Sequence, residues 1–145
     1  MPQLNYDQLK TILPHAYPFL LIDKVEDYKE NEYLIATKNI TGNEWMAEGQ
    51  SFVGHHFPET LLIESAAQAA LVLYHVTKVK MTAIKPKYFL GKARARFKKI
   101  VHYGEILRTN VFSRKMLDSG GYADVHILGN GILKAKFELI FKVQR

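Results

Sequence analysis

Two adjacent histidines and one glutamate are the side chains in this sequence best suited to move a proton. His55 and His56 come nine and eight residues before Glu64, and imidazole is the side chain that most readily gains and loses a proton near neutral pH. Both histidines lie in residues 45–58, a stretch rich in glycine, histidine and aromatic residues that is too long for a simple connection. We therefore expect a site where this loop meets the segment that carries Glu64.

A helix over residues 61–79 is predicted to carry Glu64. The segment is apolar on almost every side, which is typical of a buried helix rather than a surface one. Small residues over 65–70 would let a sheet approach it closely, and Gln68 lies one turn beyond Glu64 on the same face. An unpaired buried carboxylate is costly, so we predict a functional role for Glu64.

The rest of the chain predicts strands around this helix. A short helix over residues 6–13 ends before a proline, as expected for the residue that precedes one. Strands over residues 19–25 and 33–40, on either side of a polar turn at 29–31, predict a hairpin. Four alternating runs follow, over residues 88–97, 106–116, 122–128 and 132–143, with glycine-containing turns between them. One long helix and about six antiparallel strands predict a single α+β domain over residues 1–145.

The composition excludes several kinds of site. The chain has 145 residues and no cysteine, which removes disulfides, thiolate metal sites and thiol nucleophiles together. Four other histidines match no metal-ligand spacing, so we interpret them as structural or surface residues and expect neither a metal nor a cofactor. These histidines are His15, His75, His102 and His126.

The formal net charge of +6 favours an acidic partner. Much of the positive charge lies between Lys78 and Lys99. We expect no nucleic-acid partner, because no helix-turn-helix, zinc or RNP-type signature accompanies the charge. No run approaches the roughly 20 apolar residues needed to span a bilayer, and the first residues lack the layout of a signal peptide. We therefore expect a cytoplasmic protein without a membrane span.

Five blocks of sequence resemble the FabA/FabZ-type 3-hydroxyacyl-(acyl carrier protein) dehydratases. Residues 13–25 read LPHAYPFLLIDKV, close to the family pattern LPHRYPFLLVDRV. Residues 38–44 (KNITGNE) and 61–68 (LLIESAAQ) are similar to its KNVTxNE and LIIEAxAQ. Residues 88–91 (YFLG) with 95–97 (ARF), and 101–105 (VHYGE), are similar to YFAG, ARF and VxPGD. The blocks occur in the family's order over nearly the whole chain.

This resemblance implies a hot-dog fold, in which a curved antiparallel sheet wraps a long central helix. It also implies a homodimer with two tunnels at the subunit interface, with a trimer of dimers as the larger alternative. The implied activity is that of a lyase, which converts a 3-hydroxyacyl thioester on an acyl carrier protein to a trans-2-enoyl thioester in fatty-acid or polyketide-like synthesis.

Such a reaction needs a base, an acid and amide donors for the thioester oxygen. In the family, the base is the histidine of FxGHFP and the acid is the helix glutamate of the other subunit, which Glu64 matches.

The histidine motif is where this sequence departs from the family. An alignment without gaps from Asn43 to Glu64 places Gln50 at the histidine, and a neutral amide cannot act as the base. The alternative aligns His55 or His56 with the motif, at the cost of an insertion and a compensating deletion. We favour the gapless alignment and expect one of these two loop histidines to replace the base.

The resemblance also assigns residues to binding. Glu59 stands where the family has a glycine that opens the helix, and a carboxylate there is expected to lie against the helix amides. The basic segment 85–99 is expected to meet an acidic carrier protein. The predicted substrate-binding residues are Gln68, Glu59, Tyr88, Phe89 and Gly91, and the predicted carrier-binding residues are Lys92 and Arg94.

Two other functions fit the same fold, because a fold does not fix a function. The first is a non-catalytic member that binds acyl chains or a carrier protein. The second is a hot-dog acyl thioesterase, in which Glu64 would activate water instead.

Overall fold

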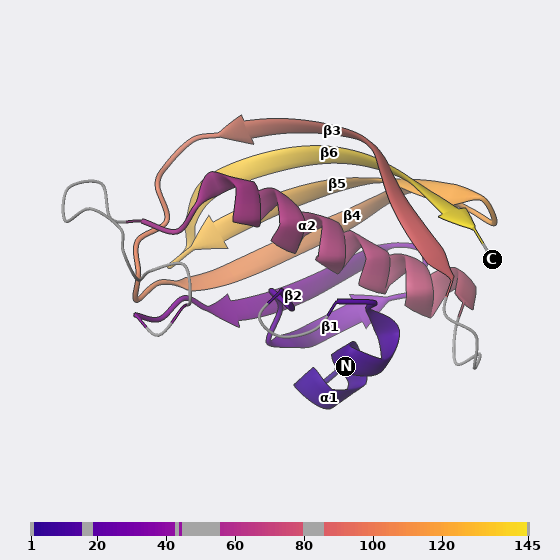
Figure 1. Cartoon of the computed structure of the whole chain (residues 1–145), viewed down its shortest axis with the longest axis horizontal. Helices are drawn as coiled ribbons and strands as arrows, with labels where there is room; N and C mark the ends of the chain where they lie inside the picture. The colour runs from indigo at the N-terminus through magenta and orange to yellow at the C-terminus, as the bar shows by residue number, and fades with distance from the viewer. Residues whose placement is uncertain (1, 16–18, 43, 45–55, 80–85, 145) are drawn as a thin grey trace.

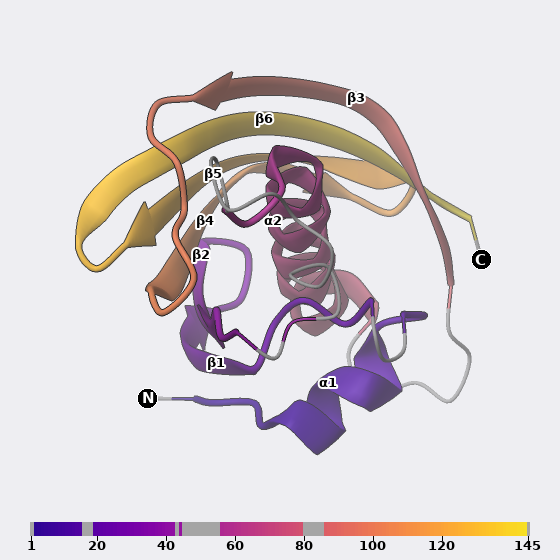
Figure 2. The same cartoon turned by 60° about the vertical axis from the view of Figure 1, so that its left-hand side comes forward.

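A long helix lies against the concave face of a six-stranded antiparallel sheet in the computed structural model, which describes residues 2–15, 19–42, 44, 56–79 and 86–144. Figures 1 and 2 show the sheet curving around this helix, α2, while the short helix α1 lies away from the sheet. The predicted α+β hot-dog fold is therefore confirmed.

The helical elements are α1 (Tyr6–Ile12) and α2 (Glu59–Tyr74), which continues as the π-helical turn η2 (His75–Val79). The strands are β1 (Lys24–Lys29), β2 (Tyr33–Asn39), β3 (Lys87–Phe97), β4 (Ile106–Leu117), β5 (Gly120–Gly129) and β6 (Ile132–Gln144).

The strand order in the sheet is β1-β2-β4-β5-β6-β3. Strands β1 and β3 therefore form its two edges. Strand β3 pairs with β6, although β4 and β5 lie between these two strands in the sequence (Figure 1). The predicted β1–β2 hairpin is confirmed, and the four runs from residue 88 onward form a meander only over β4, β5 and β6. The expectation that the strand over residues 88–97 pairs with the next strand in the sequence is wrong, because β3 pairs with β6 instead. The turn between β5 and β6 has two residues, Asn130 and Gly131, with φ of 49° and 84°. An Asn-Gly pair tolerates these left-handed angles, which match the twist of a hairpin.

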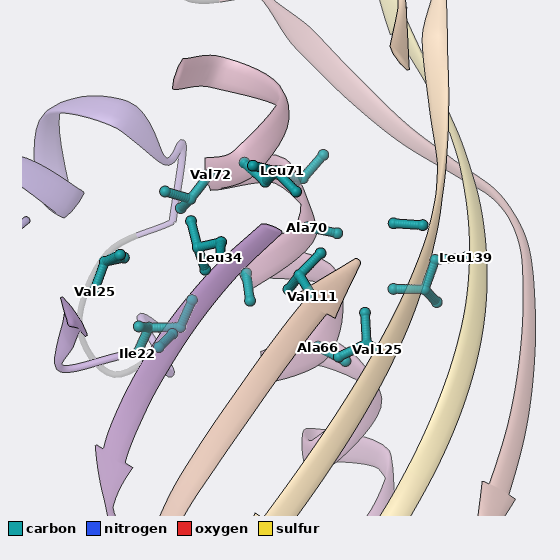
Figure 3. Packing of buried hydrophobic residues seen from close by; sticks show 14 of the residues in the cluster. Ile22, Val25, Leu34, Ala66, Ala70, Leu71, Val72, Val111, Val125 and Leu139 are labelled. Carbon is teal, nitrogen blue, oxygen red and sulfur yellow. The ribbon is translucent and has the colours of Figure 1, made fainter. Parts of the chain in front are cut away.

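The small residues of α2 bring the helix close to the sheet. Ala66, Ala69 and Ala70 have no exposed surface. Figure 3 shows Ala66 and Ala70 among Val111 and Val125 of strands β4 and β5. Larger side chains at the alanine positions would push the helix away from the strands, since protein interiors have few voids.

The helical segment Glu59–Val79 is 21 residues long and apolar enough, by length and composition, to cross a membrane. Glu59, Glu64 and Lys78 interrupt this segment, so it is not the unbroken apolar run that the sequence was expected to lack. Within the fold, however, 67% of its most apolar window is buried. The segment is covered by the strands of its own chain, as expected for the core helix of a globular domain.

The predicted strand over residues 19–25 is wrong, because β1 begins only at Lys24. Residues 19–21 are instead bound by side chains of α2. Gln68 accepts a hydrogen bond from the Leu21 amide (2.8 Å) and donates one to the Phe19 carbonyl (2.7 Å). Ser65 donates to the Leu21 carbonyl at 3.0 Å. These side chains satisfy backbone groups that a strand would have paired with a neighbouring strand.

A buried ion pair fixes the start of β6 to the segment between β3 and β4. Lys134 is only 5% exposed, and its Nζ lies 3.0 Å from Glu105 Oε1 and donates to the Ile100 carbonyl at 2.9 Å. Burial by itself would raise the pKa of Glu105, but the His102 amide and the Lys134 ammonium outweigh it. The pKa of Glu105 therefore lies below its ordinary value, and the carboxylate form stabilises the fold.

Candidate active site

Glu64 lies in the wall of a pocket of about 190 Å³ beside the edge strand β3. Helix α2 positions it, because Glu64 is on the side of this otherwise apolar helix that faces residues 14–15 and β3. The glutamate side chain is 40% exposed, so a substrate can reach it. Most of the wall is apolar, and the remaining lining residues are Pro14, His15, Ala67, Leu71, Tyr88, Leu90, Leu139 and Phe141.

His15 is the direct partner of Glu64 in this pocket. Its Nε2 lies 3.0 Å from Glu64 Oε1, and its side chain is 24% exposed. The hydrogen bond from His15 is the largest influence on Glu64 and lowers the pKa of the carboxyl. Burial opposes this effect, while Gln68 and the charge of His15 add to it, so the pKa of Glu64 stays below its ordinary value. Glu64 is therefore a carboxylate at neutral pH.

The sequence interpretation of His15 as a structural or surface residue missed this contact. The only available signal was its place in the longest matching block, residues 13–25. Nothing in local periodicity links that block to α2. The link is Gln68, which is fully buried and uses its amide to bind the backbone at Phe19 and Leu21.

Gln68 thus positions the segment that follows His15. Its Nε2 also lies 3.4 Å from Glu64 Oε1, a long and weak hydrogen bond. The prediction that Gln68 binds substrate stays a prediction, since both ends of its amide bind the protein's own backbone.

Only part of the predicted loop over residues 45–58 belongs to the described residues. Gln50 and His55 lie outside the described residues. His56 is described and half-buried just before α2, but it is not one of the described residues that line the Glu64 pocket. Glu59 is the first residue of α2 and is exposed, after Pro58 at the N-cap. A role for either loop histidine as the base stays a prediction.

The residues of strand β3 that were predicted to bind substrate do not all line the same pocket. Tyr88 lines the Glu64 pocket, whereas Phe89 is 51% exposed and lines a separate groove of about 600 Å³. Neighbouring residues of a strand point to opposite faces, which explains the separation. Gly91 falls at an irregularity in the pairing of β3 with β6, between Leu90 and Lys92.

Lys92 and Arg94 lie together on the other face of β3. They line a shallow pocket of about 250 Å³ with Tyr122, Glu138 and Ile140. Arg94 Nη1 is 3.5 Å from Glu138 Oε2, and both groups are well exposed. A second hollow beside it is lined by Arg94, Arg96 and Lys136 together with His126 and the carboxylates Asp124 and Glu138. Burial, followed by the charge of Lys136, lowers the pKa of His126. With Lys92, four lysine and arginine side chains therefore face two carboxylates on this part of the sheet surface.

The pocket contains groups for acid–base chemistry. A carboxylate and an imidazole in hydrogen-bond contact can exchange a proton, and apolar walls suit an acyl chain. Within the described ranges, no three histidine, aspartate or glutamate side chains gather closely enough to hold a metal ion.

A sheet wrapped around a helix, with a carboxylate on that helix beside the edge strand, defines a hot-dog protein with an acid–base site. The sequence matches the family model of the FabA-like domain over residues 13–142. This match covers most of the chain, and the chain therefore belongs to the FabA-like family.

Sequence relatives narrow the comparison within this family. The chain is 40% identical over 114 residues to the 3-hydroxyacyl-[acyl-carrier-protein] dehydratase FabZ of Legionella pneumophila (strain Lens), covering 74% of this chain and 73% of the relative. It is 33% identical over 146 residues to the protein of the same name from Clostridium botulinum (strain Kyoto / Type A2), covering 97% and 96% of the two chains.

Solved structures agree with the fold. A chain of the dehydratase heterocomplex ApeI:P from Xenorhabdus doucetiae superposes with a TM-score of 0.80 at 17% identity, covering 94% of this chain and 90% of that one. The E. coli PaaI protein superposes with a TM-score of 0.59 at 16% identity, covering 83% and 81%. At these identities the likeness shows the fold alone.

Proposed function

We propose that this protein removes water from a 3-hydroxyacyl thioester to give a trans-2-enoyl thioester, with Glu64 as a catalytic carboxylate. The observation that carries the proposal is the position of Glu64 on α2, in contact with His15 in an apolar pocket. The names of the FabZ relatives supply the substrate class, a 3-hydroxyacyl group on an acyl carrier protein.

The elimination breaks a C–H bond next to the thioester carbonyl and the C–O bond of the 3-hydroxyl group. A base must take the proton, and an acid must protonate the hydroxyl so that it leaves as water. Leu71, Leu90 and Leu139 provide an apolar wall for the acyl chain next to these groups.

Product analysis with the purified protein tests this function. The protein is incubated with a 3-hydroxyacyl thioester, and both the enoyl product and free thiol are measured. Enoyl formation supports the proposal. Release of free thiol without enoyl product points to a thioesterase, and the absence of both products points to a non-catalytic binding protein. Either of the last two results contradicts the proposal.

We also propose that two copies of the chain pair through β3. Within the described part of the chain, this 11-residue strand has a neighbour on one side only. Phe89, Leu90 and Phe97 are 51%, 49% and 38% exposed along it. An exposed strand edge with apolar side chains readily pairs with another chain. Tyr88 and Leu90 of β3 also line the Glu64 pocket, so a second chain on this edge would help to enclose it.

Replacing Leu90 with aspartate is expected to convert the dimer to a monomer. The carboxylate would be buried without a partner in the apolar interface, which is unfavourable. Analytical ultracentrifugation should show the mass fall by half, with the same substitution at Phe112 as the control. Phe112 is 42% exposed on β4, away from the edge. A dimer that persists in Leu90→Asp, or that dissociates equally in Phe112→Asp, contradicts pairing through β3.

We further propose that an acidic carrier protein binds the basic face that contains Lys92 and Arg94. Changing both residues to glutamate is expected to weaken binding of an acyl carrier protein by at least about tenfold at low salt, because attraction becomes repulsion. Titration calorimetry measures the effect, with Lys10→Glu on α1 as the control for a charge reversal away from this face. Unchanged affinity of the double variant, or an equal loss of affinity in the control, would contradict carrier-protein binding at this face.

A further inference from the structure

The pocket beside Glu64 runs along α2 toward the C-terminal end of this helix. Glu64, Ala67 and Leu71 line the pocket from α2, and residues at these intervals lie on one face of a helix. At about 1.5 Å per residue, Leu71 lies about 10 Å beyond Glu64 along the helix axis. Figure 1 shows the start of β3 beside the C-terminal end of α2. The pocket therefore extends from the carboxylate toward the first residues of β3.

The Glu64 end of this pocket is open to solvent, whereas its other end is buried. The Glu64 side chain is 40% exposed. Leu71 and Phe141, which line the pocket further along, are only 8% and 3% exposed. An acyl chain whose thioester lies beside Glu64 can therefore extend along Leu71, and its last carbon atoms would lie in the buried part of the pocket.

Tyr74 closes this buried end from behind. It lies on α2 three residues beyond Leu71 and has no exposed surface. Its ring contacts those of Phe141 and Tyr88 edge to face, with centroids 5.5 and 6.2 Å apart, an arrangement that aromatic pairs favour. Phe141 and Tyr88 both line the pocket, so the ring of Tyr74 lies directly behind the pocket wall.

The rings of Tyr74 and Phe141 are both fixed in place. The Tyr74 hydroxyl donates to the Leu117 carbonyl at 2.7 Å, and the Asp118 carbonyl is 3.0 Å away. Phe141 packs against Gly121, where an added Cβ would lie only 2.7 Å from the Cζ atom of the phenylalanine. Since protein interiors have few voids, these two rings have no room to move aside for a longer acyl chain.

We propose that Tyr74 and Phe141 limit the length of the acyl chain, and that this protein acts on short 3-hydroxyacyl thioesters. The inference rests on the proposed dehydration and specifies its substrate class. The pocket volume of about 190 Å³ agrees with a short chain, because pockets for drug-sized ligands usually enclose about 300–1,000 Å³. A chain that reaches Phe141 meets a ring supported by Tyr74, so a further methylene group would have to displace packed side chains.

A series of substrates of increasing chain length tests this inference. We measure kcat/KM for enoyl formation with 3-hydroxybutyryl, 3-hydroxyhexanoyl and 3-hydroxydecanoyl pantetheine thioesters. In the wild-type protein, the decanoyl substrate should give a kcat/KM at least about tenfold below that of the butyryl substrate, the effect of about one misfitting methylene group. Phe141→Leu and Tyr74→Leu should each raise the decanoyl-to-butyryl ratio at least about tenfold, because a smaller side chain leaves space at the buried end.

Two control variants separate chain length from stability. Tyr74→Phe keeps the ring and removes only the hydroxyl group, so it should keep the wild-type ratio while its melting temperature falls. Phe137→Leu is the same change as Phe141→Leu on the same strand, but Phe137 does not line the Glu64 pocket, so its ratio should also be that of the wild type. Thermal unfolding shows which variants are folded, and Phe141→Leu decides the test if Tyr74→Leu does not fold.

Binding of acyl-pantetheine amides of the same chain lengths tests the closed end without the reaction. If the wild-type protein forms no enoyl product, the proposed function fails, and the affinities of the amides still decide whether Tyr74 and Phe141 limit chain length. A wild-type protein that uses and binds decanoyl and butyryl groups equally well overturns the inference. An unchanged ratio in Phe141→Leu, or an equal change in Phe137→Leu, overturns it as well.

Discussion

Replacing Glu64 with glutamine is expected to lower kcat for enoyl formation by a factor of about 10² to 10⁴, the usual contribution of one acid–base group. Glutamine has almost the same shape and can still accept a hydrogen bond from His15, but it cannot take up a proton. The fold should be unaffected, because Glu64 is partly exposed and removing its charge leaves no empty space.

A coupled assay for the enoyl product measures this effect, with KM and thermal stability determined in parallel. Glu30→Gln is a matched control, because Glu30 is exposed in the turn between β1 and β2. A Glu64→Gln protein that retains more than about a tenth of the wild-type kcat would show that Glu64 is not an acid–base group in this reaction.

Replacing Lys134 with methionine should lower the free energy of unfolding by about 3–5 kcal/mol, as is typical when one partner of a buried ion pair is removed. Methionine fills most of the volume of the lysine stem, so the loss comes mainly from Glu105. That carboxylate is 9% exposed and would keep the His102 amide as a partner but lose the ammonium. The Ile100 carbonyl would lose its donor as well.

Urea denaturation measures the free energy of unfolding, and Lys136→Met is the control because Lys136 is exposed two residues further along the same strand. We expect that control to change stability by less than about 0.5 kcal/mol. The double variant Lys134→Met with Glu105→Gln should recover part of the loss, because no uncompensated charge remains. A loss below about 1 kcal/mol in Lys134→Met would show that the pair contributes little to the fold.

The ion pair between Glu105 and Lys134 also makes the stability of the fold depend on pH, with a loss of stability in acid. The pKa of Glu105 is lower in the folded protein than its ordinary value, so folding favours the carboxylate. This contribution is complete above the unfolded pKa of about 4.3 and is lost as the pH falls through the folded value. Acid should therefore destabilise the wild-type protein more steeply than Glu105→Gln in this pH range. Parallel stability curves for the two proteins would contradict the pH dependence assigned to Glu105.

Most of the fold could be predicted because its patterns are local. Residues 61–79 are apolar on almost every side, and residues 132–143 alternate, so each segment indicates its own structure without knowledge of its neighbours. Asn130-Gly131 likewise indicates a hairpin by itself. The sequence could not show which strands form the edges of the sheet. That β3 lies beside β6 at an edge is a matter of topology, and it is why Phe89 and Leu90 are exposed.

In the candidate active site, too, some features follow from the sequence and others only from the tertiary structure. The sequence by itself determined that Glu64 lies on a buried helix, where an ionisable group needs a partner, and this is why it could be identified. The identity of that partner was decided only by the tertiary structure. Gln68 and Ser65 bind the backbone of residues 19–21 where a strand was predicted, and His15 contacts Glu64 of the same helix. Hydrogen bonds from side chains to a distant backbone depend on the folded arrangement and leave no periodic pattern in the sequence.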